Sequence, residues 1–470
     1  MRTRKPWFFL FLLLVLVLPA CSAGGEDPEP EENITTLIYA QISEDGLDKT
    51  AVSAFNRKHK IIGDVQIEVR NYMELAADDK SGKSAMDLLL TEIGAGKIPD
   101  IIDLGRDGQT CQLPYQKLVE KGYLEDLWPY IENDPKLGLD GVIKAPLKAV
   151  EIDGGLYTIF DAFCIQTLIG AKSVVGDRTG WTMDDLREAF AAMPEGSVLV
   201  DDLTGSSARF EKYGGSDMKT HMLNCFMYVY FDSLVDEETG KCHFDSPEFR
   251  EILELVNTLP SNYDWKKYIF GETERDRRSA LIDELSERKQ DGIVMLDISG
   301  IYRIYNLQSL WFDFRGEVSL VGYPTTDGTG GSYFMPVGRM LSMSSTCKNK
   351  EAAWEVMRQM LMAKGELTEV GAVPVNATMY ARDVGKSMNI NISFEYRRGN
   401  IVHIPTMTRK DTLAFKNYVD SVTKCTLFVE PEILDMVAET AGPYFAGDRP
   451  LDLTVELIQN RVQLYINENR

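Results

Sequence analysis

The stretch that decides the fold is SAMDLLLTEIGAGKIPDIIDL, residues 84–104. Residues 84–95 read as a helix that ends among glycines, which commonly stop helices. Pro99 then opens a short apolar run over 100–104. Because proline cannot donate a ladder hydrogen bond, it suits the first residue of a strand, and an apolar run of this length is typical of a buried one. A helix followed closely by a buried strand predicts a βαβ unit.

The flanking segments continue this alternation of strands and helices. Strands are predicted over 35–42 (TTLIYAQI) and 65–71 (VQIEVRN), and helices over 47–59 and 112–121, the last stopped by Gly122. Such alternation predicts the α/β class with mainly parallel sheets. Because 470 residues exceed one ordinary core, and no long linker appears after Glu32, two domains joined by short crossovers are expected.

The N-terminus has the pattern of an export signal. A basic start at residues 2–5 precedes an apolar run over 7–18 that is too short to span a bilayer comfortably. The following LPAC, ending at Cys21, resembles the lipobox of bacterial lipoproteins, in which the cysteine is diacylated and becomes the first mature residue. This predicts a signal peptide over 1–20 and lipidation of Cys21. The alternative is an ordinary secreted chain with a chance cysteine at this position.

The segment after Cys21 is small, acidic and rich in proline and glycine. It cannot bury enough apolar surface to offset its ordering entropy, so a disordered acidic tether is predicted over 21–33. A frayed terminus would have the same composition. Together with the signal, the tether predicts a protein held by lipid at the extracytoplasmic face of a bacterial cell membrane.

The charge of the chain restricts its partners. The formal net charge is −22, and removing the three basic leader residues lowers it to −25. A chain this acidic is a poor candidate for binding nucleic acid or an anionic membrane surface. The charge also argues weakly against an anionic solute, although one local arginine could overrule it.

Cysteine and histidine usage gives no sign of a metal centre. The seven cysteines lack zinc-ribbon spacing, and the four histidines lie outside helical reach of one another. Neither a metal nor a cofactor is therefore expected. If Cys21 is lipidated, six cysteines remain and could pair, but their irregular spacing favours buried small apolar residues.

The sequence shows none of the common catalytic motifs for a nucleophile elbow, a phosphate loop or a metalloprotease helix. The glycines at 328–331 precede a predicted strand at 332–335, which favours a turn over a phosphate-binding loop. Acidic pairs at 78/79, 184/185 and 201/202 are more typical of solvated faces than of a glycosidase. The protein is predicted not to be an enzyme, with a secreted glycoside hydrolase as the enzymatic alternative.

Eight short blocks occur in an order known from one family. They are AFN (54–56), GKIPDII (96–102), GYLEDL (122–127), GGLY (154–157), WTMDDL (181–186), GIVM with SG (292–295, 299–300), AAWE (352–355) and GAVPVN (371–376). From about residue 34 onward the chain resembles the family 1 extracellular solute-binding proteins, the group that includes maltodextrin-binding protein. It departs from their pattern at Thr158 and Ile159, where proline is usual.

The resemblance implies a type II periplasmic-binding-protein fold with two lobes, each a mainly parallel sheet flanked by helices, joined by hinge crossovers. Lobe one is predicted over 34–160 and 335–388, and lobe two over 161–334 and 389–470. The implied function is capture of a solute, here a carbohydrate, between the lobes of a monomer and its delivery to the permease of an ABC importer. A sensing or scaffolding lipoprotein of the same fold is the alternative.

Ligand contacts are expected just beyond the carboxyl ends of the strands and at the crossovers. The candidates are Gln41, Ser43, Glu44, Asp45, Arg106, Asp107, Phe160, Asp161, Tyr302, Trp311 and Tyr333. Tyr302 falls where the resemblance implies a stacking tryptophan, and Arg106 and Asp107 where it implies polar sugar contacts. The alternative for Arg106 is a surface salt bridge to Asp103 or Asp107. The alternative for Trp311 and Tyr333 is packing in the core.

Overall fold

The computed structural model describes residues 34–42, 53, 56–57, 65–79, 82–104, 115–137, 141–200, 218–236, 238–259, 284–298, 300–361, 372–396 and 400–469. Most of the helix predicted over 47–59 lies outside these residues. So do the candidates Ser43, Glu44, Asp45, Arg106 and Asp107, and the predicted lipidation site Cys21.

The larger sheet holds the first strands of the chain. In the described part of the protein it has seven strands, in the order β12-β4-β11-β3-β1-β2, with β15 also pairing β11. Its strands are β1 (Thr35–Gln41), β2 (Val65–Asn71), β3 (Ile101–Asp103), β4 (Ile159–Gln166), β11 (Tyr333–Met343), β12 (Val373–Pro374) and β15 (Lys424–Cys425). β1 pairs in parallel with β2 and β3, whereas β11 runs antiparallel to β3 and β4. The predicted α/β class is confirmed.

The second sheet has four strands in the described residues, ordered β10-β5-β9-β6. They are β5 (Ile169–Ala171), β6 (Val198–Val200), β9 (Val294–Asp297) and β10 (Val318–Leu320). Two hairpins stand apart: β7 (Val235–Asp236) with β8 (Lys241–Cys242), and β13 (Ile392–Tyr396) with β14 (Asn400–Ile404).

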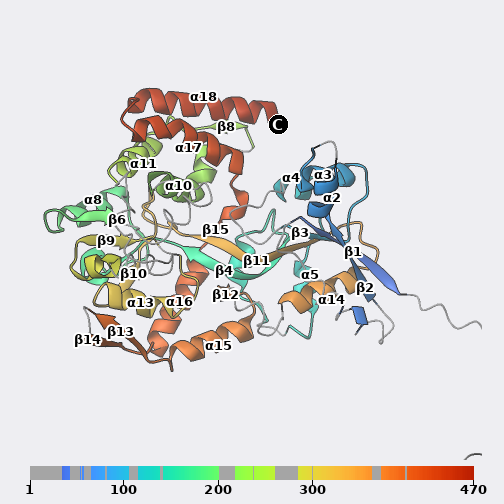
Figure 1. The fold of residues 1–470 in the computed structure, drawn as a ribbon, viewed down its shortest axis with the longest axis horizontal. Coiled ribbons are helices and arrows are strands. Elements are labelled where there is room, and N and C mark those ends of the chain that lie inside the picture. The colour runs from blue at the N-terminus through green and yellow to red at the C-terminus, as the bar shows by residue number, and fades with distance from the viewer. Residues whose placement is uncertain are drawn as a thin grey trace, which may run out of the picture.

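Helices gather around each sheet (Figure 1). Near the parallel strands of the first sheet lie α2 (Tyr72–Asp78), α3 (Ala85–Gly94), α4 (Tyr115–Glu120), α5 (Trp128–Asn133) and α14 (Lys350–Leu361). Around the second lie α8 (Met183–Ala191), α10 (Met218–Leu234), α11 (Pro247–Asn257), α17 (Pro431–Phe445) and α18 (Leu451–Asn469). The remaining elements are α6 (Lys144–Lys148), α7 (Lys172–Val175), α13 (Asn306–Asp313), α15 (Ala377–Ser387), α16 (Arg409–Ser421) and η3 (Thr426–Phe428). None of the helices in the described ranges has the length and hydropathy to cross a membrane.

Local sequence explains where several helices begin and end. Thr182 and Asp185 form a capping box at the start of α8, so a side chain satisfies an otherwise unpaired amide at each position. Ser246 caps α11, with Pro247 at its first position. Gly122 follows α4 with a φ of 66°, a left-handed conformation that glycine adopts easily. The helix stop at Gly122 is a confirmed prediction.

The described residues form two large apolar cores. The first core surrounds the larger sheet and also takes in buried residues from 301–314 and 407–427. The second packs against β6 and β9 of the four-stranded sheet and takes in residues from 429–462, whereas Ile169 and Ala171 of β5 pack in the first core. β4 and β11 run between the two ends of the molecule (Figure 1). The predicted lobes, as units that move, remain a proposal.

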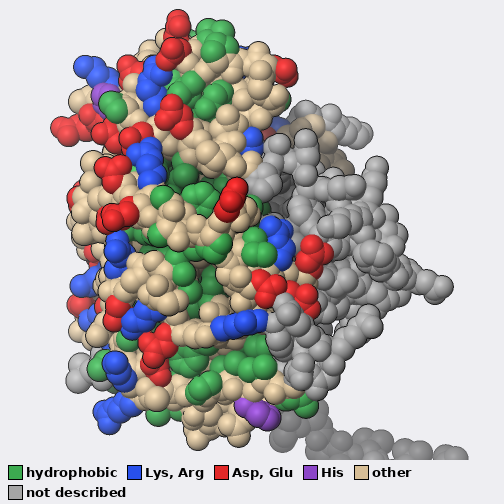
Figure 2. Space-filling view, turned by 90° about the vertical axis from the view of Figure 1, so that its left-hand side faces the viewer, with side chains coloured by type: hydrophobic (Ala, Val, Ile, Leu, Met, Phe, Trp, Pro, Cys, Tyr) green, Lys and Arg blue, Asp and Glu red, His purple; other side chains and the backbone are tan. Residues whose placement is uncertain are grey.

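Charge is mixed on the surface near the second sheet. Figure 2 shows acidic and basic side chains interspersed over this face, with apolar side chains between them. The five described cysteines, at positions 164, 225, 242, 347 and 425, are all buried thiols. The prediction that the cysteines act as small apolar residues is therefore confirmed for these five.

An ion network fastens α14 to the turn after α5. Arg358 lies 3.0 Å from Asp134 and also pairs with Glu355, which Lys136 approaches to 3.1 Å. Burial alone would raise the pKa of Glu355, but hydrogen bonds from Arg358, Gln359 and Lys136 outweigh it and lower the pKa to about 2. The charged form of this carboxylate is thus favoured by folding.

This shift predicts a loss of stability in acid. A carboxyl whose pKa is lowered on folding stabilises the protein above its unfolded pKa and loses that contribution as pH falls through its folded pKa. Glu355→Gln should therefore lower the free energy of unfolding at neutral pH, with the difference from wild type shrinking as pH falls toward about 2. Urea unfolding across pH measures this, with exposed Glu132→Gln as the control. A difference that is independent of pH would contradict the assignment.

Candidate functional site

The two faces of β4 have different surroundings. Its sequence, IFDAFCIQ, is apolar on both faces except at Asp161 and Gln166, so alternation alone does not distinguish them. Pairing with β11 does, because Met335 lies opposite Cys164 and Phe334 lies opposite Ile165. Phe334 and Ile165 pack in the first core. The other face carries a separate small cluster of Ala162, Cys164, Met335, Val337 and Ala372.

A short segment extends this second face beside β4. Ile301 forms a bridge with Ile165, and their backbone amides and carbonyls exchange hydrogen bonds of 2.8 and 3.2 Å. The antiparallel register places Gly300 beside Gln166 and Tyr302 beside Cys164. A Cβ atom at Gly300 would lie 2.6 Å from the Gln166 amide nitrogen, so a side chain there would displace that amide. We call Ala162, Cys164, Gln166, Gly300, Tyr302, Met335, Val337 and Ala372 the crossover face.

The crossover face combines small apolar groups with neutral polar ones. The Gln166 amide lies 3.5 Å from the Cys164 sulfur. Burial raises the pKa of the Cys164 thiol to about 12, against weaker opposing hydrogen bonds from Gln166 and Tyr302, so the thiol stays neutral. Tyr302 is the exposed aromatic side chain of this face, at 37%. A face that carries an exposed aromatic ring, an amide and small side chains suits a ligand with both apolar ring faces and hydroxyls.

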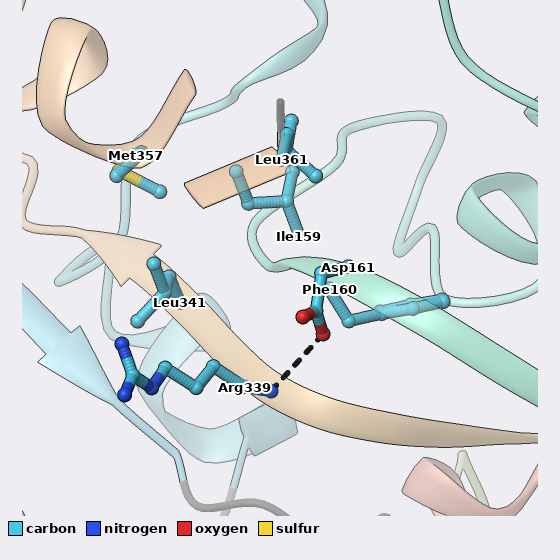
Figure 3. Close-up of a pocket in the computed structure, with 7 residues that line it drawn as sticks. All are labelled: Ile159, Phe160, Asp161, Arg339, Leu341, Met357 and Leu361. Carbon is cyan, nitrogen blue, oxygen red and sulfur yellow. Dashed lines mark hydrogen bonds between the residues drawn. The ribbon is translucent and has the colours of Figure 1, made fainter. Parts of the chain in front are cut away.

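Asp161 lies at a bulge in β11 rather than on the crossover face. The register of β11 against β4 shifts between Val337 and Met340. At the shift, the Asp161 carboxylate accepts a hydrogen bond of 3.2 Å from the Arg339 backbone amide. In the close-up, the Arg339 side chain extends away from Asp161, below Met357 of α14 (Figure 3). Asp161 thus borders a small, mostly apolar pocket under α14.

Polar groups meet at the carboxyl ends of the parallel strands. Gln41 of β1 is paired with Asp103 of β3, at the edge where ligand contacts were expected. Both side chains are buried, and the Tyr39 hydroxyl donates to Asp103 at 2.6 Å. Burial, followed by the Asp103 charge, raises the pKa of Tyr39 well above its usual value. Gln41 thus ends β1 at this edge with a buried side chain, and its part in ligand binding remains a prediction.

The other aromatic candidates lie in apolar surroundings. Phe160 belongs to the first core, and Trp311 of α13 is partly buried against it. Tyr333 is buried in the second core and stacks on Tyr323 with ring centroids 6.1 Å apart. This burial matches the core alternative for Trp311 and Tyr333. Their part in ligand binding, like that of Phe160, remains a prediction.

The structure places some residues on the crossover face that sequence reasoning missed. Cys164, Gln166 and Met335 lie around the predicted Tyr302, although they are distant in sequence. Gly300 was the available signal, because a glycine after a buried strand often marks a close approach of backbone to another group.

Comparisons with known proteins identify the fold. No protein-family model matches the chain, and no curated protein matches it. The sugar-binding protein MalE from Xanthomonas citri matches at 15% identity and a TM-score of 0.53, covering 93% of this chain and 98% of that one. A family 1 extracellular solute-binding protein from Alicyclobacillus acidocaldarius matches at 14% identity and 0.51, covering 92% and 98%. A periplasmic oligogalacturonide-binding protein from Yersinia enterocolitica matches at 14% and 0.51, covering 92% and 99%.

The protein therefore has the type II periplasmic-binding-protein fold, and this prediction is confirmed. Its structural neighbours are family 1 extracellular solute-binding proteins, the family that the sequence blocks resemble. At identities of 14–15%, these matches establish the fold, and function has to be argued from the site.

Proposed function

We propose that this protein captures a carbohydrate at the crossover face and delivers it to the permease of an ABC importer. The observation that carries the proposal is that exposed Tyr302 lies beside Cys164 of β4, whose sulfur is also 3.5 Å from the neutral amide of Gln166. The apolar face of a sugar ring stacks on an aromatic side chain, and its hydroxyls pair with amides. The sugar and oligogalacturonide binders of the same fold support this reading.

Binding between two lobes connects capture to delivery. A ligand that contacts both lobes favours the closed arrangement by its difference in affinity for the closed and open states. The permease would then recognise the closed form. In this proposal the chain acts as a monomer and needs neither covalent chemistry nor a cofactor. The proposed moving units are residues 34–160 with 335–388, and residues 161–334 with 429–470. Residues 389–428, which the sequence blocks assigned to lobe two, include Met407, Phe415 and Tyr418 of the first core and are assigned to neither unit.

The proposed location follows from the N-terminal pattern. Lipid on Cys21 would hold the protein at the extracytoplasmic face of the cell membrane, and the acidic stretch after it would act as a tether. Contact with the membrane would then occur through the lipid alone. A tethered binding protein stays near its permease, which raises its effective concentration there.

The ligand class can be tested by thermal shift. A ligand that binds the native state raises the melting temperature by mass action. We expect a shift with a neutral mono- or oligosaccharide from a panel that also contains uronates, peptides, polyamines and divalent metals. A shift with a peptide, polyamine or metal, and with no carbohydrate, would reject the sugar assignment and leave the fold unaffected.

Tyr302→Ala should weaken binding of the carbohydrate that the panel selects. The loss should be about 1–3 kcal/mol, the range for a stacked aromatic together with its buried area. Isothermal titration calorimetry measures the affinity. Tyr302→Phe is the matched control, because it keeps the ring and should bind nearly as well as wild type. If the alanine variant also binds like wild type, the ligand does not use this side chain.

A further inference from the structure

Three buried hydroxyls form a closed ring near the crossover face. Thr167 and Tyr418 are 2.7 Å apart, Thr167 and Ser332 are 2.9 Å apart, and Ser332 and Tyr418 are 2.6 Å apart between oxygens. All three side chains are buried. Ser332 donates to Thr167, whose hydroxyl also donates to the Leu168 carbonyl at 3.3 Å. In the two contacts with Tyr418 either oxygen can donate, so the three hydroxyls can also be oriented so that each donates once and accepts once.

The ring lies where the chain passes between the two sheets. Thr167 follows β4 of the larger sheet and is two residues before β5 of the smaller one. Ser332 lies between β10 of the smaller sheet and β11 of the larger one. Tyr418 is on α16, and soon after that helix the chain leaves the first core for the second, between Phe428 and Val429. We call these three segments, where the chain changes sheet or core, the passages. The ring has one hydroxyl in each of the first two passages and one on the helix that precedes the third.

Backbone hydrogen bonds tie the first two passages to each other beside the ring. The amides of Val321 and Gly322 both donate to the Leu168 carbonyl, at 2.9 and 3.2 Å. Thr167 also directly follows Gln166 of the crossover face. A change in the geometry of the ring would therefore reach the passages and the proposed binding surface together.

We propose that the ring is the pivot about which the two lobes turn. Close to a rotation axis, atoms move least, so three contacts below 3 Å can persist while more distant groups separate. Tyr418 is a positioning residue in this account, since it holds the first two passages together and makes them bend as one unit. This inference rests on the proposed function, because a pivot matters only if the lobes move.

Hydrogen exchange on the protein without added ligand tests the pivot. Tyr418→Phe removes two of the three contacts and should make the amides of Val321, Gly322, Ile165 and Ile301 exchange about tenfold faster, together, while α18 is unchanged. Tyr115→Phe is the matched control. It removes a hydroxyl that is buried in the same core, where it donates to the Val150 carbonyl at 3.0 Å. That variant should leave exchange at the passages as in wild type.

Ser332→Ala gives an independent check if Tyr418→Phe folds poorly, because it also removes two contacts of the ring. The pivot is supported if exchange increases in both passages in these variants and not in the Tyr115 control. It is overturned if the passages exchange as in wild type, or if exchange rises equally across α18. Because no sugar is present, a failed carbohydrate screen would count against the proposed function and would leave this result standing.

Discussion

Gly338→Ala should lower the free energy of unfolding by about 2–4 kcal/mol, from a left-handed backbone and from overpacking. Gly338 has a φ of 87° at the bulge in β11. A Cβ atom there would overlap the Asp161 carboxylate. Asp161 cannot move away freely, since its carboxylate accepts the Arg339 amide and its backbone carbonyl accepts the Val375 amide.

Equilibrium unfolding in urea measures this effect, and the chain offers a matched control. Gly385 lies inside α15, and a Cβ atom there would meet nothing within 4 Å. Gly385→Ala should therefore be neutral or stabilise the protein by about 0.5–1 kcal/mol, as alanine does in a helix. If both variants had the same small effect, the bulge would accept a side chain and Asp161 would not restrain it.

Cys21→Ala should release the protein from membranes or leave its signal peptide uncleaved. The effect should be close to complete, because acyl chains at Cys21 would be the sole attachment in the proposed anchor. Fractionation of cells that express wild type and variant measures the partition. Ser22→Ala keeps the cysteine and should partition as wild type does.

Mass spectrometry of the mature N-terminus decides the anchor directly. We expect wild-type protein to begin at Cys21 and to carry lipid. Mature protein that begins at another residue and carries no lipid would show an ordinary secretory signal, which is the alternative that the LPAC sequence leaves open. The proposed carbohydrate function would be unaffected by that result.

Much of the fold could be predicted because its signals are local. The strands β1 and β2 follow from runs of β-forming residues, and α8 and α11 follow from the caps at Thr182 and Ser246. Each signal depends on a few neighbouring residues. The order of the blocks then predicted the two-lobed fold, which the structural neighbours confirm.

The candidate site was harder to predict because it depends on pairing between distant segments. β4 is apolar on both faces, so only its register with β11 shows that Cys164 faces away from the first core. Tyr333 is an aromatic residue of the type that stacks on sugars. In the structure, however, it is buried and packs against Tyr323. Sequence periodicity reports burial, and it does not tell which of two buried faces borders a ligand.

The hydroxyl ring shows the same difficulty. Its members are separated by between 86 and 251 residues, and serine, threonine and tyrosine are common on any surface. Nothing in the local sequence distinguishes Tyr418 from the other tyrosines of the chain. Such contacts are set by the tertiary arrangement, which brings α16 against the passages between the sheets.

The buried thiols allow local opening of the protein to be measured by cysteine alkylation. Cys347 and Cys425 lie in the first core, Cys225 and Cys242 in the second, and Cys164 on the crossover face. A thiol reacts with an alkylating reagent as its thiolate and only when it is accessible. The rate at which each cysteine is alkylated therefore measures how often its own region opens. Peptide mapping after a short pulse of reagent would report the stability of both cores and of the crossover face in one experiment. The native cysteines suffice, so no cysteine has to be introduced by mutation.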